Sequence, residues 1–172
     1  MRGSDPDAAV YYLARMLYAG EDVKFIARRI MILASEDIGN ADPMAMVVAS
    51  ACAQEVERVG MPEAQLILAQ AVTYMASAPK SNASCEAIFK AMRVVKETKT
   101  PPVPTHLQDA HYKSAEKLGH GLGYKYAHDY PNHYVKQQYL PDGLTDQVFY
   151  EPTDIGYEKQ IREYFKKIKE ES

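Results

Sequence analysis

A cluster of prolines sets the strongest limit on how this chain can fold. Pro101, Pro102 and Pro104 stand close together, and no helix continues through such a run, because proline lacks the backbone N–H and restricts the residue before it. Composition changes at the same place. Residues 1–99 hold four of the 10 prolines and four of the 13 tyrosines, and residues 100–172 hold the others. We therefore expect two segments, 1–99 and 100–172, that together form one structural unit.

The first segment is predicted to be a bundle of five helices. Asp5-Pro6 and Asp42-Pro43 each place a capping carboxylate before a proline, which suits the first position of a helix. Three glycines stand where helices should end, spaced 19 and 21 residues apart: Gly20, Gly39 and Gly60. This spacing is typical of antiparallel helices of about 15 residues joined by short turns.

Apolar residues at helical spacing indicate which faces should be buried. In the third predicted helix this face includes Cys52. In the fifth it consists of Cys85, Ile88, Phe89, Met92 and Val95. Both cysteines fall on such faces, so we expect buried thiols and not a redox or metal site.

The segment 64–79 differs from the other predicted helices because it is nearly apolar all round and contains no charged residue. Such a helix must be covered on most of its surface. It is predicted to be the central helix of the bundle, part of a subunit interface, or both. The residues proposed for an oligomer interface are Leu66, Ile67, Tyr74 and Met75.

The second segment, 100–172, is rich in Tyr, Pro and Gly and has no long hydrophobic period. We predict a short helix over 110–118 and an ordered, loop-rich stretch after it. An amphipathic helix from Asp154 to Glu170 should pack back onto the bundle. Its apolar stripe is Tyr157, Ile161, Tyr164, Phe165 and Ile168.

The motifs of the common catalytic and cofactor sites are missing from the sequence. It contains no G-x-x-x-x-G-K-[ST] phosphate-binding loop, no H-E-x-x-H, no C-x-x-C and no G-x-S-x-G. All histidines fall within residues 106–133, without the i, i+4 spacing that places two metal ligands on one helix face. We therefore predict no catalytic residue, no cofactor and no metal, and hence no enzymatic activity of this chain itself.

Composition excludes several classes of protein. The formal net charge of −3 excludes a globally basic nucleic-acid-binding protein. No run approaches the ~20 apolar residues of a membrane span, and we find no secretory signal. Two cysteines are too few for a disulfide framework. We expect a cytoplasmic protein without a membrane partner.

Local basic and aromatic residues leave nucleic-acid binding open. Lys113, Lys125 and Lys136 alternate with tyrosines in the segment 112–139, and single-stranded DNA is bound by lysines on phosphates and aromatic rings on bases. Arg28 and Arg29 form a second basic spot on a predicted helix. The alternative is that all five are ordinary solvated charges.

Several strings resemble the C-terminal domain of the replication-associated recombination ATPases, which are the bacterial RarA or MgsA proteins and the eukaryotic Werner-helicase-interacting protein. The resemblance extends from Arg2 to about Phe165, in the family's order and spacing. The strings are Arg2–Ala9, Tyr12–Met16, Ala19–Asp22, Phe25–Arg29, Ile32–Gly39, Ala78–Ala83, Gly123–Asp129 and Gln138–Pro141.

This resemblance implies a role in a larger protein. The family consists of AAA+ ATPases related to clamp loaders, whose ATP and Mg²⁺ site lies upstream of the part that this chain resembles. Their C-terminal region resembles a clamp-loader collar and holds subunits together, as a homotetramer in the bacterial protein. The family acts in DNA replication-fork maintenance, recombination and repair, close to the nucleoid, in association with single-stranded-DNA-binding protein. The resemblance implies an oligomerisation and scaffold domain. The alternative is a module that binds single-stranded DNA or a partner protein.

Overall fold

The computed structural model describes residues 1–109 and 118–170. The chain divides into two compact units: Met1–Phe89 with Tyr150–Arg162, and Lys90–Phe149 with Glu163–Ser172 as far as these are described. The described residues form helices and helical turns and contain no strand, which confirms the predicted mainly α fold. Within these ranges, no helix has both the length and the apolar character that crossing a membrane requires.

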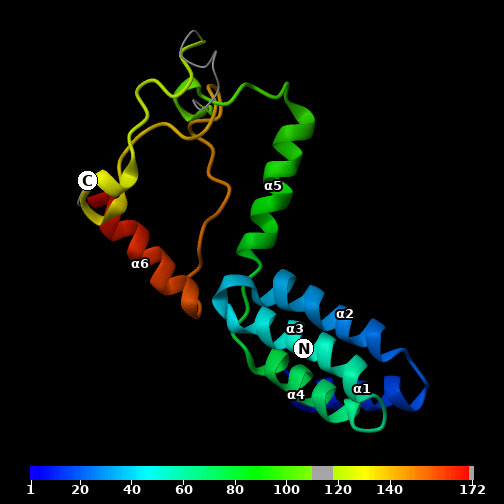
Figure 1. Cartoon of the computed structure of the whole chain (residues 1–172). Helices are drawn as coiled ribbons and strands as arrows, with labels where there is room; N and C mark the ends of the chain where they lie inside the picture. The colour runs from blue at the N-terminus through cyan, green and yellow to red at the C-terminus, as the bar shows by residue number, and fades with distance from the viewer. Residues whose placement is uncertain (110–117, 171–172) are drawn as a thin grey trace. The chain divides into compact units, whose positions relative to one another are not determined.

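Four helices form the body of the first unit: α1 (Pro6–Tyr18), α2 (Val23–Leu33), α3 (Met44–Val59) and α4 (Ala64–Ser77). They lie side by side and are joined by short connections (Figure 1). α4 packs against the other three helices. The helix without charged residues therefore lies at the centre of the bundle, as one of the two sequence-based readings predicted.

α1, α2 and α3 begin where aspartate side chains satisfy free backbone N–H groups. The Asp5 carboxylate accepts a hydrogen bond from the Ala8 N–H at 2.9 Å, and Pro6 follows as the first helical residue. The Asp42 carboxylate accepts one from the Met44 N–H at 3.1 Å. α2 continues into a π-helical turn, η1 (Ala34–Ile38), which ends at Gly39 with a φ of +50°.

The core of the first unit is built largely from alanine, which lets the helices approach closely. The largest fully buried apolar side chains are Ile30, Ile38, Leu68, Met75 and Val56. Cys52 is also buried in this core, as predicted. The complete buried cluster comprises residues of α1, α2, η1, α3 and α4 together with Ala78. It includes no residue of the fifth helix.

The fifth helix, α5 (Ala83–Glu97), corrects one prediction. Its apolar face was expected to lie in the core, yet no residue of α5 is buried. Ile88 is 56% exposed and Phe89 60% exposed, and Met92 and Val95 are exposed as well. Cys85 is only partly buried. Helical periodicity identified the residues that share this face. The core, however, is formed by α1 to α4 with η1 and does not include α5.

The second unit consists mainly of loops and short 3-10 turns: η3 (Thr105–Leu107), η5 (Ala127–Asp129) and η6 (Pro131–His133). The predicted helix over 110–118 falls almost entirely on residues 110–117, which lie outside the described residues. The predicted C-terminal helix is present as α6 (Tyr157–Glu170). Of its apolar stripe, Ile168 is buried, whereas Tyr157, Tyr164 and Phe165 remain exposed.

Candidate functional site

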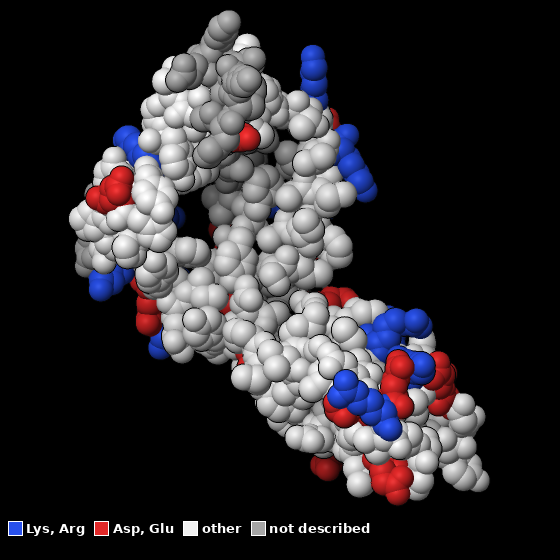
Figure 2. All heavy atoms as spheres, in the orientation of Figure 1, with Lys and Arg blue, Asp and Glu red and all other residues white. Residues whose placement is uncertain are grey.

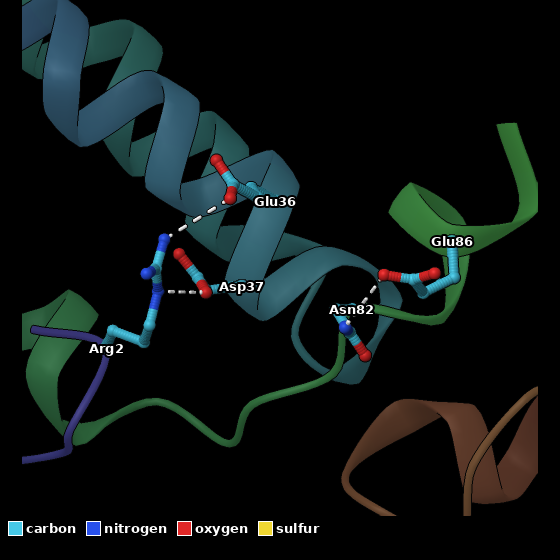
Figure 3. A network of polar contacts seen from close by, with 5 residues as sticks. All are labelled: Arg2, Glu36, Asp37, Asn82 and Glu86. Atoms are coloured by element: carbon cyan, nitrogen blue, oxygen red, sulfur yellow. Dashed lines mark hydrogen bonds and ion pairs between the residues drawn. The ribbon is translucent and has the colours of Figure 1, made fainter. Parts of the chain in front are cut away.

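A polar junction lies where the N-terminal residues meet the end of α2. Arg2 donates from Nε to Oδ1 of Asp37 at 2.6 Å and from Nη2 to Oε1 of Glu36 at 3.2 Å. Figure 3 shows the guanidinium pointing at both carboxylates, which project from η1. The Arg2 side chain is largely exposed, so this ion pair contributes little to stability and is screened by salt. It joins the N-terminal segment to η1.

Ser81 joins the same junction from the connection between α4 and α5. Its backbone N–H donates to the carbonyl of Asp37 at 2.8 Å. Gly39 lies against this connection, because a Cβ there would come within 3.0 Å of both the Ser81 carbonyl and the Ser84 hydroxyl. Asn82, one residue further on, bonds Glu86 in the first turn of α5 (Figure 3). The strings Arg2–Ala9, Ile32–Gly39 and Ala78–Ala83, far apart in sequence, therefore meet at one place.

Glu158, in the first turn of α6, is the buried charge of this junction. Its Oε2 accepts hydrogen bonds from the Ser81 hydroxyl at 2.7 Å, the Thr153 hydroxyl at 2.7 Å and the Thr153 N–H at 2.9 Å. Its Oε1 accepts one from the Tyr150 hydroxyl at 3.1 Å. The Asn40 amide in turn donates to the Tyr150 hydroxyl. The segment 150–158 is thus held on the bundle by a fully buried carboxylate.

The electrostatics of Glu158 explain how a carboxylate is tolerated there. Burial alone would raise its pKa, but the hydrogen bonds from Thr153, Ser81 and Tyr150 outweigh burial and lower the pKa below its ordinary value. Burial and the hydrogen bond to this carboxylate raise the pKa of Tyr150, against the opposing effect of Asn40. Hydrogen-bond donors therefore surround an ionised Glu158. Its carboxylate joins the start of α6 to Ser81 and to the segment that contains Tyr150 and Thr153. Sequence reasoning missed this residue, because it belongs to the polar face of an amphipathic helix.

The basic residues predicted to touch nucleic acid fall into two groups. Arg28 and Arg29 are exposed neighbours on α2 in the first unit, but they turn in different directions. The Arg28 guanidinium lies over the Phe25 ring, 5.4 Å from its centroid, whereas Arg29 lines a hollow beside α1. Figure 2 shows basic and acidic side chains intermingled on the visible face of the bundle, in agreement with the Lys24–Glu57 ion pair.

Lys125 and Lys136 belong to the second unit and are both exposed. The main chain of Lys125 is bonded at its N–H and carbonyl to the side-chain amide of Gln137, at 3.2 and 2.8 Å. The two lysines therefore lie on adjoining stretches of chain. Lys113 lies outside the described residues.

The residues predicted for an oligomer interface differ in how much surface they offer. Leu66 is 67% exposed, and Ile67 is partly buried against the core. The Tyr74 hydroxyl donates to Oδ2 of Asp42 at 2.6 Å, which joins α4 to the start of α3. Met75 is fully buried and presents no surface to a second chain in this conformation. Of the four residues, Leu66 has the most exposed side chain.

Histidines and carboxylates do not assemble a metal site among the described residues, since no three of them, with cysteines included, converge. The Nδ1 atoms of His128 and His133 are 3.2 Å apart, and Nε2 of His106 is 2.8 Å from the Gln138 carbonyl. The contact between His128 and His133 is local, whereas the contact of His106 joins residues 32 positions apart in the sequence.

An open apolar groove of about 650 Å³ lies in the first unit between α2, the start of α3 and the first turns of α5. Ile88, Phe89 and Cys85 form its α5 side. Met31, Ile32 and Met46 line the other side, and Arg28 and Glu36 stand among the lining residues. Cys85, Ile88 and Phe89 therefore belong both to the groove and to the apolar face of α5.

The fold and its polar junction define an all-helical bundle domain with a loop-rich appended unit. The chain belongs to the family of MgsA AAA+ ATPase C-terminal domains, whose sequence profile matches residues 3–169. The family expected from the sequence strings is thereby confirmed.

Relatives from distant organisms agree with this assignment. The chain is 58% identical over 94% of its length to an uncharacterized AAA domain-containing protein of Mycobacterium tuberculosis, of which it covers 36%. It is 46% identical over 98% of its length to replication-associated recombination protein A of Bacillus subtilis, of which it covers 40%. It is 40% identical over 88% of its length to ATPase WRNIP1 of Dictyostelium discoideum, of which it covers 17%. The chain therefore spans two-fifths or less of these relatives.

Proposed function

We propose that this chain is the oligomerisation and scaffold domain of an AAA+ ATPase that acts in replication-associated recombination, and that it assembles the ATPase subunits into a homotetramer. The family and the names of the relatives support the ATPase and recombination parts of this proposal. In this proposal, ATP and Mg²⁺ are bound outside this chain. The chain contributes no catalytic residue, and its role is to hold the ATPase subunits in a fixed arrangement.

The observation that carries the proposal is the uncovered apolar face of α5. A helix with apolar residues on one face normally buries that face. Here the core of the first unit closes without α5, and Ile88, Phe89, Met92 and Val95 stay exposed. Burying one large apolar side chain contributes about 1.5–3 kcal/mol, so a second chain that covers this face would gain appreciable binding free energy.

Sedimentation equilibrium of the purified chain tests this proposal. We expect the average mass to rise with concentration toward that of four chains, because association follows mass action. A strictly monomeric chain at tens of micromolar would contradict it. The measurement needs neither nucleotide nor DNA, since the proposed role belongs to this chain.

Binding of single-stranded DNA is a second candidate, favoured by the exposed rings of the second unit. Tyr124, Tyr126 and Tyr139 are exposed, as are Lys125 and Lys136. Such rings can stack on bases while the lysines contact phosphates. A partner such as single-stranded-DNA-binding protein would also fall in this class.

Fluorescence anisotropy with a labelled single strand at low salt tests this candidate. We expect salt-sensitive binding that weakens when Lys113, Lys125 and Lys136 are changed together to alanine. Glu21→Ala and Lys24→Ala, changes at exposed positions of the first unit, serve as controls. Absence of binding at low salt would remove the candidate.

A further inference from the structure

The uncovered face of α5 has the spacing of a helix-pairing seam. Cys85, Ile88, Met92 and Val95 are separated by three, four and three residues, which is the first-and-fourth pattern of a heptad repeat. Phe89 lies beside this row. A heptad seam presents a narrow stripe that another helix with the same pattern covers well. The sequence of α5 therefore favours a helix as the occupant of this face.

We propose that α5 pairs with α5 of a second copy of this chain in antiparallel orientation, and that Met92 and Val95 of that copy enter the apolar groove beside Cys85 and Ile88. This proposal rests on the self-association proposed above and names its interface. The contact is isologous, because the same face of each chain is used twice around a two-fold axis. The axis crosses the seam side of α5 at the level of residue 90, midway along the helix between Cys85 and Val95.

The position of the groove selects the antiparallel orientation. The groove lies beside the first half of the seam only, where Cys85 and Ile88 form one of its sides. In an antiparallel pair, Met92 of the second copy lies opposite Ile88, and its Val95 lies opposite Cys85. Each groove then receives the second half of the other seam. In a parallel pair the groove of one copy would face the groove of the other copy, and the apolar residues that line both grooves would stay uncovered.

Repulsion between like charges favours the same orientation. Lys96 flanks the C-terminal end of the seam, one residue after Val95. Ser84 and Glu36 lie at the opposite end of the seam, among the residues that line the groove. Antiparallel pairing brings each Lys96 to the groove of the other copy, whose lining includes Arg28 and Glu36, the latter already ion-paired with Arg2. Parallel pairing instead sets two Lys96 side chains next to each other. The helix dipoles also oppose each other favourably in the antiparallel pair.

Disulfide trapping tests the orientation on the full chain. We begin from Cys85→Ser, and keep Cys52 because it is buried. Ile88→Cys and Met92→Cys are added in separate chains, which are oxidised mildly, alone and as an equal mixture. We expect the mixture to form several-fold more covalent dimer than either chain alone. Equal or greater trapping in the single chains would overturn the antiparallel arrangement. Lys90→Cys, on the opposite side of α5, is the matched control.

Sedimentation separates failure of this interface from failure of the proposed function. Met92→Asp places a charge on the seam at an exposed position, so folding should be retained, which circular dichroism checks. We expect its average mass to fall about twofold or more relative to wild type, with Lys90→Asp unchanged. If wild type is monomeric, self-association and the interface both fail. If wild type associates and Met92→Asp has the same mass, only the α5 interface is overturned.

Discussion

The hydroxyl of Ser81 donates a hydrogen bond to the carboxylate of Glu158 at 2.7 Å, across a sequence separation of 77 residues. The same hydroxyl accepts a hydrogen bond from the Ala83 N–H at 3.2 Å, in the first turn of α5. One buried side chain thus fixes the start of α5 and holds the start of α6 on the bundle.

Removing the Glu158 carboxylate should destabilise the chain strongly. Glu158→Ala leaves the hydroxyls of Ser81, Thr153 and Tyr150 without their acceptor in a buried place, and we expect a loss of about 3 kcal/mol in the free energy of unfolding. Glu158→Gln keeps the shape and one acceptor oxygen and should lose less. Urea unfolding followed by circular dichroism measures both. Glu151→Ala, at an exposed position of the same segment, should be close to neutral, and an equally small effect of Glu158→Ala would contradict the assignment.

The ionised state of Glu158 predicts a pH dependence. Its pKa is lowered from the ordinary value of 4.5, so its contribution to stability is fully present above the unfolded-state pKa and is lost as pH falls through the folded-state pKa. We expect the difference in unfolding free energy between wild type and Glu158→Gln to be constant near neutral pH and to shrink on acidification below about pH 5. A difference that stays constant down to pH 3 would show that Glu158 is not a stabilising anion.

Gly156 should tolerate no side chain. A Cβ there would lie 2.1 Å from the carbonyl oxygen of Ala41, at a φ of +57°. Gly156→Ala therefore forces the segment 150–158 away from the bundle, and we expect a loss of about 3 kcal/mol together with faster amide exchange in that segment. Gly20→Ala is the matched control, since Gly20 has a φ of +79° and open space around it. It should lose only about 1 kcal/mol, the cost of the left-handed conformation, and equal losses at both glycines would argue against the contact with Ala41.

Local signals in the sequence predicted the helices of the bundle but not what covers them. The Asp5-Pro6 pair and Gly39 mark boundaries that the structure contains, because capping and positive φ depend on neighbouring residues. The sequence predicted correctly which residues share the apolar face of α5 but wrongly placed that face in the core. Periodicity shows which residues lie on one side of a helix, but it does not show which element packs against that side. Glu158 was unpredictable for a related reason: its partner Ser81 is brought to it only by the return of the segment after residue 149.

The bond between Tyr74 and Asp42 should be visible in a titration. The hydrogen bond to Asp42, burial and the nearby negative charge raise the pKa of Tyr74 to about 12. Ultraviolet titration of wild type minus Tyr74→Phe should therefore show one phenol that ionises well above pH 10. Asp42→Asn should bring that ionisation back toward 10. The bond stabilises the fold below pH 10 and is lost as pH rises through about 12, so an unchanged titration in Asp42→Asn would refute it.

Two residues of α4 proposed as interface residues should behave in opposite ways. Met75 is fully buried and Leu66 is 67% exposed. Met75→Ala removes core contacts and leaves a cavity, so we expect a loss of about 2–5 kcal/mol in the free energy of unfolding. Leu66→Ala should change it by no more than about 0.5 kcal/mol in the monomer. Urea unfolding at a concentration low enough to keep the chains apart measures both, and sedimentation at high concentration then reports on Leu66 alone. A lower mass for Leu66→Ala would place α4 beside α5 in the subunit contact, whereas an unchanged mass would restrict α4 to the bundle core.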